Sequence, residues 1–324
     1  MSSYDLICIG AGPTGLSCAI EAQRAGMRAL AVDKGCLCNS LYRYPTNMVF
    51  FTTSERLEIG DLPLTSAGDK PTRAEALKYY RKAAAHYQLD LCLYERVERV
   101  EGADERFVVH THTTNGVANQ YAAKKIVIAT GYYDLPNPLG VPGENLPHVS
   151  HYFTEAHPYW DQDVVVVGGA NSAAEAALDL FRAGARVTLV HWRAQLGSTL
   201  KYWVRPDIEN RIKAGEIRAL LETRVTRIEP RRVWVQGSNG ERPLPARQVF
   251  ALTGYHPDFD FLRQLGVALD PQTHKPAMDP ETFESNVPGI HLAGVVIGGN
   301  ATGEIFIENG RFHGKKIIGA LGGK

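Results

Sequence analysis

The residues with the clearest chemical meaning are three glycines near the start of the chain. Gly10, Gly12 and Gly15 follow a short apolar run and enclose Pro13 and Thr14 in the spacing G-x-G-x-x-G. In this pattern the first glycine permits a tight turn, the second lets the backbone approach a diphosphate, and the third allows a helix to pack closely on a strand. Because a helix N-terminus has free N–H groups and a positive dipole end, it favours phosphate. The pattern predicts a dinucleotide site.

An acidic residue at a suitable distance supports this prediction. Asp33 stands 18 residues after Gly15, where a second apolar run ends, and is placed to accept hydrogen bonds from ribose hydroxyls. The glycine spacing alone is weak evidence, because it often occurs by chance. Here a predicted strand (4–9), helix (16–25) and second strand (28–32) agree with the position of the acid.

A second glycine cluster has different chemistry at its far end. It follows the apolar run 164–167 and consists of Gly168, Gly169, Ala170, Asn171, Ser172 and Ala173. Alanine replaces the middle glycine, and basic residues at His191 and Arg193 replace the acid. A carboxylate there would repel a 2′-phosphate, whereas Arg193 and His191 would bind one. We therefore expect NADPH rather than NADH, with a solvated charged loop as the alternative interpretation.

Two unlike dinucleotide sites in one chain indicate two unlike nucleotides. An enzyme that holds both usually passes a hydride from nicotinamide to flavin. We therefore expect FAD at the first cluster and NADPH at the second, and we predict no metal site.

Length and composition are typical of a soluble protein with two domains. The 324 residues are 44% hydrophobic and 22% charged, and the formal net charge is zero. This balance gives no electrostatic reason to bind nucleic acid or an anionic membrane. No stretch approaches about 18 consecutive apolar residues, and the N-terminus does not resemble a signal peptide. The five cysteines, an odd number, favour reduced thiols in the cytoplasm.

The remaining patterns predict the elements that would position these sites. Thr72 and Glu75 have capping-box spacing and predict a helix as far as Tyr87. A stretch rich in proline and aromatic residues, 132–159, resembles a linker. Further β structure is expected over 91–101, 107–113, 120–123, 125–129, 186–190, 217–236, 249–252 and 289–293, with a last helix from about Ile305. The predicted fold class is α/β, with two Rossmann-like dinucleotide-binding domains, the second inserted in the first.

Several short motifs resemble the flavoprotein superfamily with two dinucleotide-binding domains, which includes the low-molecular-weight thioredoxin reductases. They are the two glycine clusters, Ala129-Thr130-Gly131 and Ala293-Gly294. The resemblance implies a discontinuous FAD-binding domain, residues 1–135 and 252–324, around an NADPH-binding domain, residues 136–251.

The same resemblance implies which residues lie near the flavin. Ala129, Thr130 and Gly131 would lie near its ring, and Gly294 near the pyrophosphate and ribityl chain. The aspartate that usually follows this glycine is Val295 here, so one customary contact to the ribityl is missing.

A narrower resemblance is to the bacillithiol disulfide reductase family. The residues that carry it are Tyr44-Pro45-Thr46-Asn47, Phe50-Phe51, Ile59-Gly60-Asp61, Lys70 to Arg73, His151-Tyr152-Phe153, Gly254 to Asp258 and Ile305 to Gly310. It implies NADPH-dependent reduction of bacillithiol disulfide by a cytosolic homo-oligomer, a dimer or a tetramer. Lys34, Asn47, Val97 and Ile305 are further expected FAD contacts.

One position departs from that family. Its better-known members have a cysteine at the position of Thr14, the candidate catalytic position, where the thiol is proposed to attack the substrate disulfide. Threonine has no thiolate and cannot form a mixed disulfide. Either reduced flavin acts directly, or another thiol acts, or the acceptor differs, as in a ferredoxin- or flavodoxin-type NADP reductase. A flavin-bound redox sensor is the remaining alternative.

No cysteine pair has the spacing of a known dithiol centre. The only close pair is Cys36 and Cys38, and a C-x-C disulfide closes a small, strained ring. The pair is roughly 10–17 Å of chain beyond the ribose-binding acid, which places it near the pyrophosphate and short of the flavin ring. We expect packing rather than redox chemistry for this pair. Cys8, Cys18 and Cys92 lie in predicted core elements, where thiols are inert.

Overall fold

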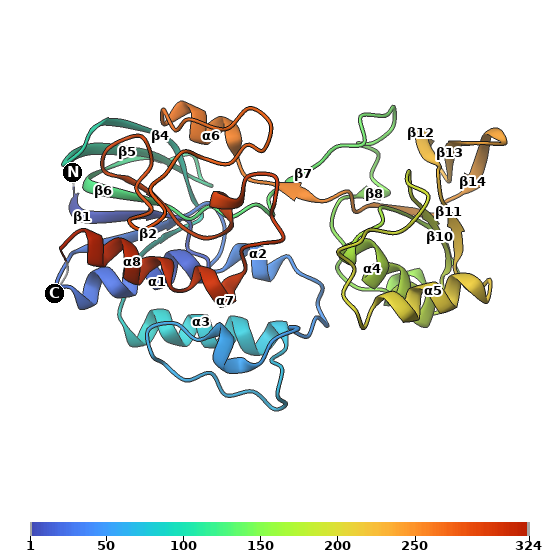
Figure 1. The fold of residues 1–324 in the computed structure, drawn as a ribbon, viewed down its shortest axis with the longest axis horizontal. Helices are drawn as coiled ribbons and strands as arrows, with labels where there is room; N and C mark the ends of the chain where they lie inside the picture. Colours follow the sequence, from blue (N-terminus) through green and yellow to red (C-terminus); the bar gives the residue numbers. More distant parts are fainter. Residues whose placement is uncertain (1, 323–324) are drawn as a thin grey trace. The chain divides into compact units, whose positions relative to one another are not determined.

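The computed structural model describes residues 2–322, which divide into two compact units. The first consists of residues 2–43, 47–135 and 256–322, and the second of residues 44–46 and 136–255. Figure 1 shows the blue and red ends of the chain in one unit and its green and yellow middle in the other. Each unit has its own parallel sheet, as the repeated glycine pattern predicts.

The sheet of the first unit has the N-terminal strand near its centre. Its order is β3-β2-β1-β6-β5-β4, and β17 also pairs with β6. The strands are β1 Ser2–Ile9, β2 Ala29–Asp33, β3 Asp90–Leu93, β4 Glu95–Ala103, β5 Arg106–Thr113, β6 Ala118–Ile128 and β17 Ile290–Leu292. All pairings are parallel except those of β5 with β4 and β6. Consecutive residues Leu6, Ile7 and Cys8 are fully buried, because helices and loops cover both faces of the sheet.

Among the helices of the first unit, α3 and α6 begin with a side-chain N-cap. The helices are α1 Pro13–Arg24, α2 Asn39–Tyr42, α3 Arg73–His86, α6 Phe259–Gln264, α7 Ile307–Gly310 and α8 His313–Ala320, with the 3₁₀ turns η1 Ser54–Leu57 and η3 Gly294–Gly298. The capping box of α3 is confirmed: Thr72 Oγ1 accepts the Glu75 N–H at 3.2 Å, and the Glu75 carboxylate accepts the Thr72 N–H at 2.8 Å. α1 and α8 lie side by side (Figure 1), and a Cβ at Gly314 would lie only 2.8 Å from Cα of Cys18.

The C-terminal helix differs from the prediction. We expected one helix from about Ile305, but the chain forms the single turn α7 and then α8. Between them, the Ser17 hydroxyl on α1 donates a hydrogen bond to the Arg311 carbonyl at 2.6 Å. A continuous helix would bond that carbonyl to its own backbone, so this contact with α1 accompanies the break.

The second unit combines a parallel sheet with a small antiparallel one. The parallel order is β11-β10-β9-β15-β8, and β12, β13 and β14 form a meander. The strands are β8 Val149–Ser150, β9 Asp163–Val167, β10 Arg186–Val190, β11 Arg218–Leu220, β12 Arg224–Glu229, β13 Arg232–Gly237, β14 Gly240–Pro245 and β15 Gln248–Ala251. The helices are α4 Asn171–Arg182 and α5 Arg205–Lys213, with the turn η2 His157–Tyr159; a further two-stranded sheet consists of β7 Leu135–Pro136 and β16 Tyr255–His256.

Most of the stretch predicted as a linker is an ordered part of the second unit. β8 lies within this stretch and pairs with β15. Phe153 is buried and packs edge-on against Phe250, with 5.3 Å between the ring centres. The local composition suggested a linker because it cannot show this contact with a residue almost a hundred positions away.

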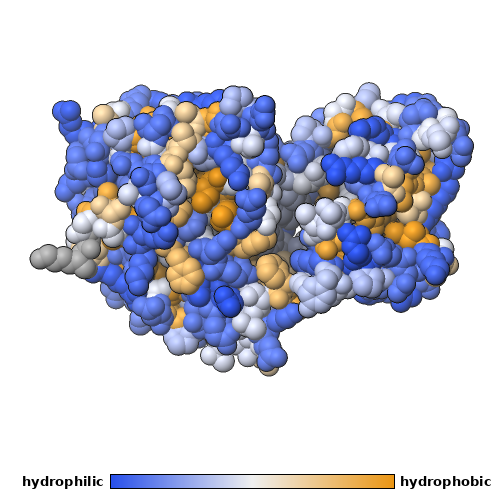
Figure 2. Space-filling model, in the orientation of Figure 1, coloured by the Kyte–Doolittle hydropathy of each residue, from blue (hydrophilic) through white to orange (hydrophobic). Residues whose placement is uncertain are grey.

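The face drawn in Figure 2 is mainly polar. Figure 2 shows a face dominated by hydrophilic residues, on which apolar residues form small, separate groups. Within residues 2–322, no helix combines the length and the apolar character needed to cross a membrane.

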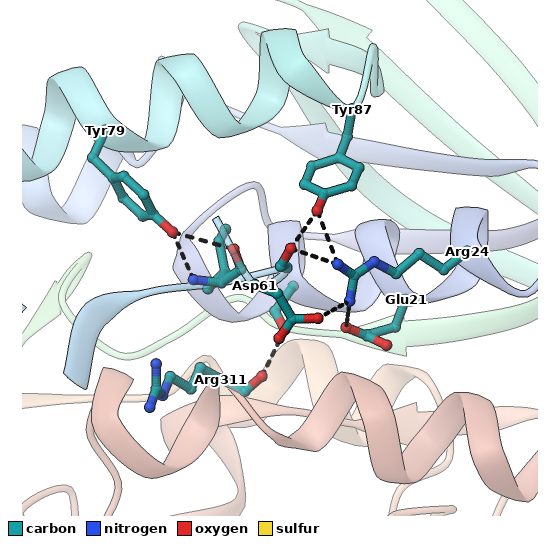
Figure 3. A network of polar contacts seen from close by, with 9 residues as sticks. Glu21, Arg24, Asp61, Tyr79, Tyr87 and Arg311 are labelled. Atoms are coloured by element: carbon teal, nitrogen blue, oxygen red, sulfur yellow. Dashed lines mark hydrogen bonds and ion pairs between the residues drawn. The ribbon is translucent and has the colours of Figure 1, made fainter. Parts of the chain in front are cut away.

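A polar network joins α1 to α3 through the loop after η1 (Figure 3). Arg24 Nη1 donates to Asp61 Oδ2 at 2.8 Å and lies 3.3 Å from Glu21 Oε1. Arg24 Nη2 donates to the Gly60 carbonyl at 2.6 Å and to the Tyr87 hydroxyl at 3.0 Å. The Tyr87 hydroxyl also donates to the Gly60 carbonyl. One arginine therefore connects three segments that are distant in sequence.

We expect Arg24→Gln to lower the free energy of unfolding by about 1 kcal/mol, because it removes the several hydrogen bonds by which this exposed guanidinium connects Gly60, Asp61 and Tyr87 to α1. Denaturant unfolding followed by circular dichroism measures the change. The control is Arg263→Gln, which removes only an exposed i,i+3 ion pair with Asp260 and should change stability by less than about 0.5 kcal/mol. Equal effects of the two substitutions would contradict the role of this network.

Candidate functional site

The first glycine cluster contains two kinds of glycine. Gly10 has φ +111°, and a Cβ there would lie 2.3 Å from the Ala129 carbonyl oxygen. A Cβ at Gly15 would lie 1.9 Å from the Gly10 carbonyl oxygen, so α1 can pack on β1 only if this residue is glycine. Gly12, in contrast, has an extended conformation, and a Cβ there would meet no atom within 4 Å. The fold therefore does not require glycine at position 12. The space beside this residue, at the N-terminus of α1, is open.

Asp33, at the end of β2, connects the turn after β1 to the turn after β2. Its Oδ2 accepts the Ala11 N–H at 2.9 Å, and its Oδ1 accepts the Gly35 N–H at 2.8 Å. Burial raises the pKa of this carboxyl, while the two N–H groups oppose the rise and the nearby charge of Asp134 adds to it. Each oxygen retains a lone pair, so the carboxylate is still able to accept a ribose hydroxyl.

A cavity of about 400 Å³ opens at the carboxyl ends of these strands. That size and position are typical of a small-molecule site on a parallel sheet. The cavity brings together residues predicted from sequence, namely Gly10, Asp33, Lys34, Val97, Thr130 and Gly131. A Cβ at Gly131 (φ +72°) would meet no atom within 4 Å, so this turn is also open.

Sequence analysis missed several residues that line the cavity, among them Asp134, Glu95 and Tyr132. Asp134 forms ion pairs with Lys34 at 3.0 Å and Arg43 at 3.5 Å. Glu95 is buried and accepts a hydrogen bond from the Tyr121 hydroxyl at 3.0 Å, and Tyr132 also lines the cavity. The position of Asp134 just after a predicted strand end was a usable signal. Nothing in the alternating charges of residues 95–101 singled out Glu95.

Thr14, on the first turn of α1, belongs to a second group of residues. A Cβ at Gly294 would lie 3.1 Å from Thr14 Oγ1, and a Cβ at Gly310 would lie 3.0 Å from the same atom. Ile305 packs near Gly310, at 3.8 Å from that added Cβ. The structure thus brings Thr14, Gly294 and Ile305 together. Asn47 is exposed in its loop and does not line the cavity described above.

A buried histidine holds the Gly294 turn. The Gly294 N–H donates to His313 Nδ1 at 3.0 Å, and the imidazole packs on Phe283 with 4.4 Å between the ring centres. Burial lowers the pKa of His313 to about 4, with a further contribution from the charge of Lys316. The imidazole is therefore neutral at pH 7 and acts as a hydrogen-bond acceptor, which a protonated ring cannot do.

The second glycine cluster repeats the first with different neighbours. Gly168 has φ +148°, and a Cβ there would lie 2.5 Å from the Leu252 carbonyl oxygen and 2.8 Å from Cβ of Ala173. Ala170 is the N-cap of α4 and is extended and exposed, so its methyl group is tolerated where the first cluster has Gly12. Asn171 Oδ1 accepts the Lys201 N–H at 2.9 Å, while Ser172 is exposed on the first turn.

His191 lies directly against this turn. A Cβ at Gly169 would lie 2.4 Å from the imidazole ring. Burial lowers the pKa of His191, and the positive charge of Arg193 lowers it further. Arg193 itself is exposed after the end of β10. The structure therefore places both predicted basic residues at the carboxyl end of the strand, with His191 at the glycine turn.

The cysteines near the first site are protonated thiols. Burial raises the pKa of both Cys36 and Cys38, and the negative charge of Asp33 raises them further. Cys38 is buried, and its backbone N–H donates to the Ala11 carbonyl at 3.0 Å. These environments oppose thiolate formation. In the part of the chain that the structure describes, no group of three or more His, Cys, Asp or Glu side chains is arranged to hold a metal ion.

The neutral state of His313 makes stability depend on pH. Its folded-state pKa of about 4 lies below the ordinary value of 6.5, so the unfolded chain binds the proton more tightly. The stabilisation is fully present above pH ~6.5 and is lost as the pH falls toward ~4, by about 3 kcal/mol from this residue. We expect His313→Asn, whose amide oxygen still accepts the Gly294 N–H, to lose less stability over this range. Denaturation midpoints at pH 7 and 4.5 measure the difference, and an equal loss in both proteins would contradict the assignment.

Comparison with known proteins agrees with this geometry. The family model described as pyridine nucleotide-disulphide oxidoreductase matches residues 7–294. The chain is 44% identical over 319 residues to the bacilliredoxin reductase Bdr of Bacillus subtilis, covering 97% of this chain and 96% of that protein. The structure of bacillithiol disulfide reductase Bdr (YpdA) from Bacillus cereus matches with a TM-score of 0.96 and 42% identity over 99% of both chains.

The fold extends to more distant proteins. The thioredoxin reductase of T. acidophilum matches with a TM-score of 0.78 at 22% identity, covering 99% of this chain and 98% of that one. The predicted fold class, α/β with two thioredoxin-reductase-like dinucleotide-binding folds, is thus confirmed. The chain belongs to the pyridine nucleotide-disulphide oxidoreductase family and, within it, to the bacillithiol disulfide reductase (Bdr) family that its sequence motifs resemble.

Proposed function

We propose that this chain is an NADPH-dependent flavoprotein that reduces a low-molecular-weight disulfide, bacillithiol disulfide, as a homo-oligomer in the cytoplasm. Its family implies FAD and a pyridine nucleotide as cofactors. Its relatives from Bacillus subtilis and Bacillus cereus are described as a bacilliredoxin reductase and a bacillithiol disulfide reductase. The observation that carries the proposal is the presence of two similar glycine turns with opposite charges beside them, Asp33 at one and Arg193 at the other.

FAD is assigned in this proposal to residues 1–135 and 252–324. Its contacts are Gly10, Gly12, Pro13, Thr14, Gly15, Asp33, Lys34, Asn47, Val97, Ala129, Thr130, Gly131, Gly294 and Ile305. The residues fit such a group, because the turns at Gly12 and Gly131 are open and the adjoining cavity contains a carboxylate for ribose hydroxyls. The N-terminus of α1 and the backbone N–H groups at Gly12 would hold the diphosphate.

NADPH is assigned to residues 136–251. Its contacts are Gly168, Gly169, Ala170, Asn171, Ser172, Ala173, His191 and Arg193. The N-terminus of α4 would hold the diphosphate, and Arg193 would pair with the 2′-phosphate. The absence of a carboxylate at the end of β10 supports NADPH over NADH, because an acid there would repel the extra phosphate.

Disulfide reduction in this chain would not use a protein thiolate. When bound, FAD supplies a carrier that takes two electrons as hydride from NADPH and passes them to a disulfide, which becomes two thiols with two protons. Thr14 stands where a nucleophilic cysteine would be needed, and threonine has no thiol to form a mixed disulfide. The raised pKa values of Cys36 and Cys38 keep these thiols protonated. We therefore propose direct electron transfer from the flavin to the substrate.

The lack of a reactive thiolate also favours a second candidate function. A ferredoxin- or flavodoxin-type NADP reductase passes single electrons to a carrier protein and needs only an accessible flavin. Thr14 is compatible with that activity as it stands.

The first test is NADPH oxidation by the FAD-loaded protein with bacillithiol disulfide. We expect turnover well above the oxygen-dependent background, and Thr14→Val should retain it within about threefold, because the hydroxyl is not a nucleophile. Stopped-flow reduction of the flavin by NADPH should be unchanged in this variant. No turnover with the disulfide, together with rapid cytochrome c reduction that requires added ferredoxin, would favour the second function instead.

The second test separates ligand binding from folding at the first glycine cluster. Gly12→Ala should leave the thermal stability of the flavin-free protein unchanged, because its methyl group meets no protein atom, yet weaken FAD binding about tenfold or more by crowding the diphosphate. Flavin fluorescence on titration measures the affinity. Gly15→Ala, the comparison variant, should fail to fold or lose several kcal/mol, because its Cβ overlaps the Gly10 carbonyl. Unchanged FAD affinity in Gly12→Ala would show that the diphosphate does not approach this residue as closely as the proposal requires.

A further inference from the structure

The carboxyl ends of β10 and β11 bring an additional arginine to the proposed NADPH site. The Glu222 N–H donates to the Arg193 carbonyl at 3.0 Å, and the Thr223 N–H donates to the His191 carbonyl at 3.0 Å. These bonds tie the segment after β11 to the segment after β10. Arg224, the first residue of β12, follows directly and therefore lies beside the end of β10. Nucleotides bind at the carboxyl ends of parallel strands, which is where this arginine is placed.

Two guanidinium groups lie close to a single exposed indole. The guanidinium carbon of Arg193 is 4.4 Å from the centre of the Trp192 ring, and that of Arg224 is 4.9 Å from it. Trp192 is 49% exposed. Within residues 2–322, neither arginine forms an ion pair with a carboxylate, whereas Arg227 on the same strand pairs with Glu241 at 2.9 Å. The two positive charges are therefore near each other without a protein anion to neutralise them.

A buried histidine lies beside the two arginines. His191 is only 7% exposed, and its ring faces the glycine turn and the backbone of Gln195. Its burial beside Arg193 lowers its pKa, so the positive charge at this end of β10 comes from the two arginines. The ring lies against Gly169, between the start of α4 and the arginines after β10.

We propose that Arg224 is a second cation for the 2′-phosphate of NADPH, acting together with Arg193. This inference rests on the proposed function and adds a specificity-determining residue to it. A phosphate that carries close to two negative charges is recognised better by two guanidinium groups than by one, and each offers paired N–H donors to its oxygens. Arg224 arrives from a different strand, so it would fix the position of the phosphate as well as neutralise it.

The experiment is a calorimetric titration of the FAD-loaded protein with adenosine 2′,5′-bisphosphate and, separately, with 5′-AMP. We expect Arg224→Gln to weaken binding of the bisphosphate about tenfold and to leave binding of 5′-AMP unchanged. The KM for NADPH should rise by a similar factor while the KM for NADH stays constant. The matched control is Arg242→Gln, an exposed arginine on β14 of the same small sheet, which should change neither ligand.

Each outcome separates this inference from the proposed function. If Arg193→Gln weakens the bisphosphate but Arg224→Gln does not, the role of Arg224 is wrong while the assignment of NADPH stands. If the unaltered protein binds the bisphosphate no more tightly than 5′-AMP and oxidises NADH as well as NADPH, the assignment of NADPH itself is wrong. Equal weakening of both ligands in Arg224→Gln would show a structural effect and would also overturn the inference.

Discussion

Both nucleotide turns depend on the close approach of a helix N-terminus to the strand before it. In the first unit the approach is so close that a Cβ at Gly15 would lie 1.9 Å from the Gly10 carbonyl oxygen. In the second, Gly168 and the small Ala173 make the equivalent contact. This packing brings the unpaired N–H groups of α1 and α4 to the carboxyl edge of each sheet. Gly12 and Ala170 lie at these two N-termini, and packing within the protein does not restrict their side chains.

Electrostatics then distinguishes two turns that are sterically similar. In the first unit the Asp33 carboxylate accepts hydrogen bonds from two backbone N–H groups, so it stabilises that turn. In the second unit His191 covers the glycine turn, and Arg193 and Arg224 follow nearby. We infer that a 2′-phosphate would be repelled by the first arrangement and attracted by the second, which is the basis of the proposed assignment of the two nucleotides.

The surroundings of Thr14 agree with chemistry that does not need a protein thiol. Its hydroxyl lies beside Gly294 and Gly310, at 3.1 and 3.0 Å from a Cβ added at these two positions. The turn at Gly294 is fixed by His313, which accepts the Gly294 N–H because its burial keeps the ring neutral. Small residues therefore surround Thr14, and its side chain offers a hydroxyl and no thiolate beside the Gly294 turn.

The sequence by itself determined those features that depend on neighbouring residues. The two glycine turns, the acid after β2 and the capping box of α3 each follow from spacings of a few residues, and the short motifs identified the family. The tertiary structure decided the rest: the contact of His313 with Gly294, the break between α7 and α8 beside Ser17, and the position of Arg224 at Trp192. These contacts join segments far apart in the chain, and the burial that sets their pKa values and hydrogen bonds exists only after the sheets and helices have packed together.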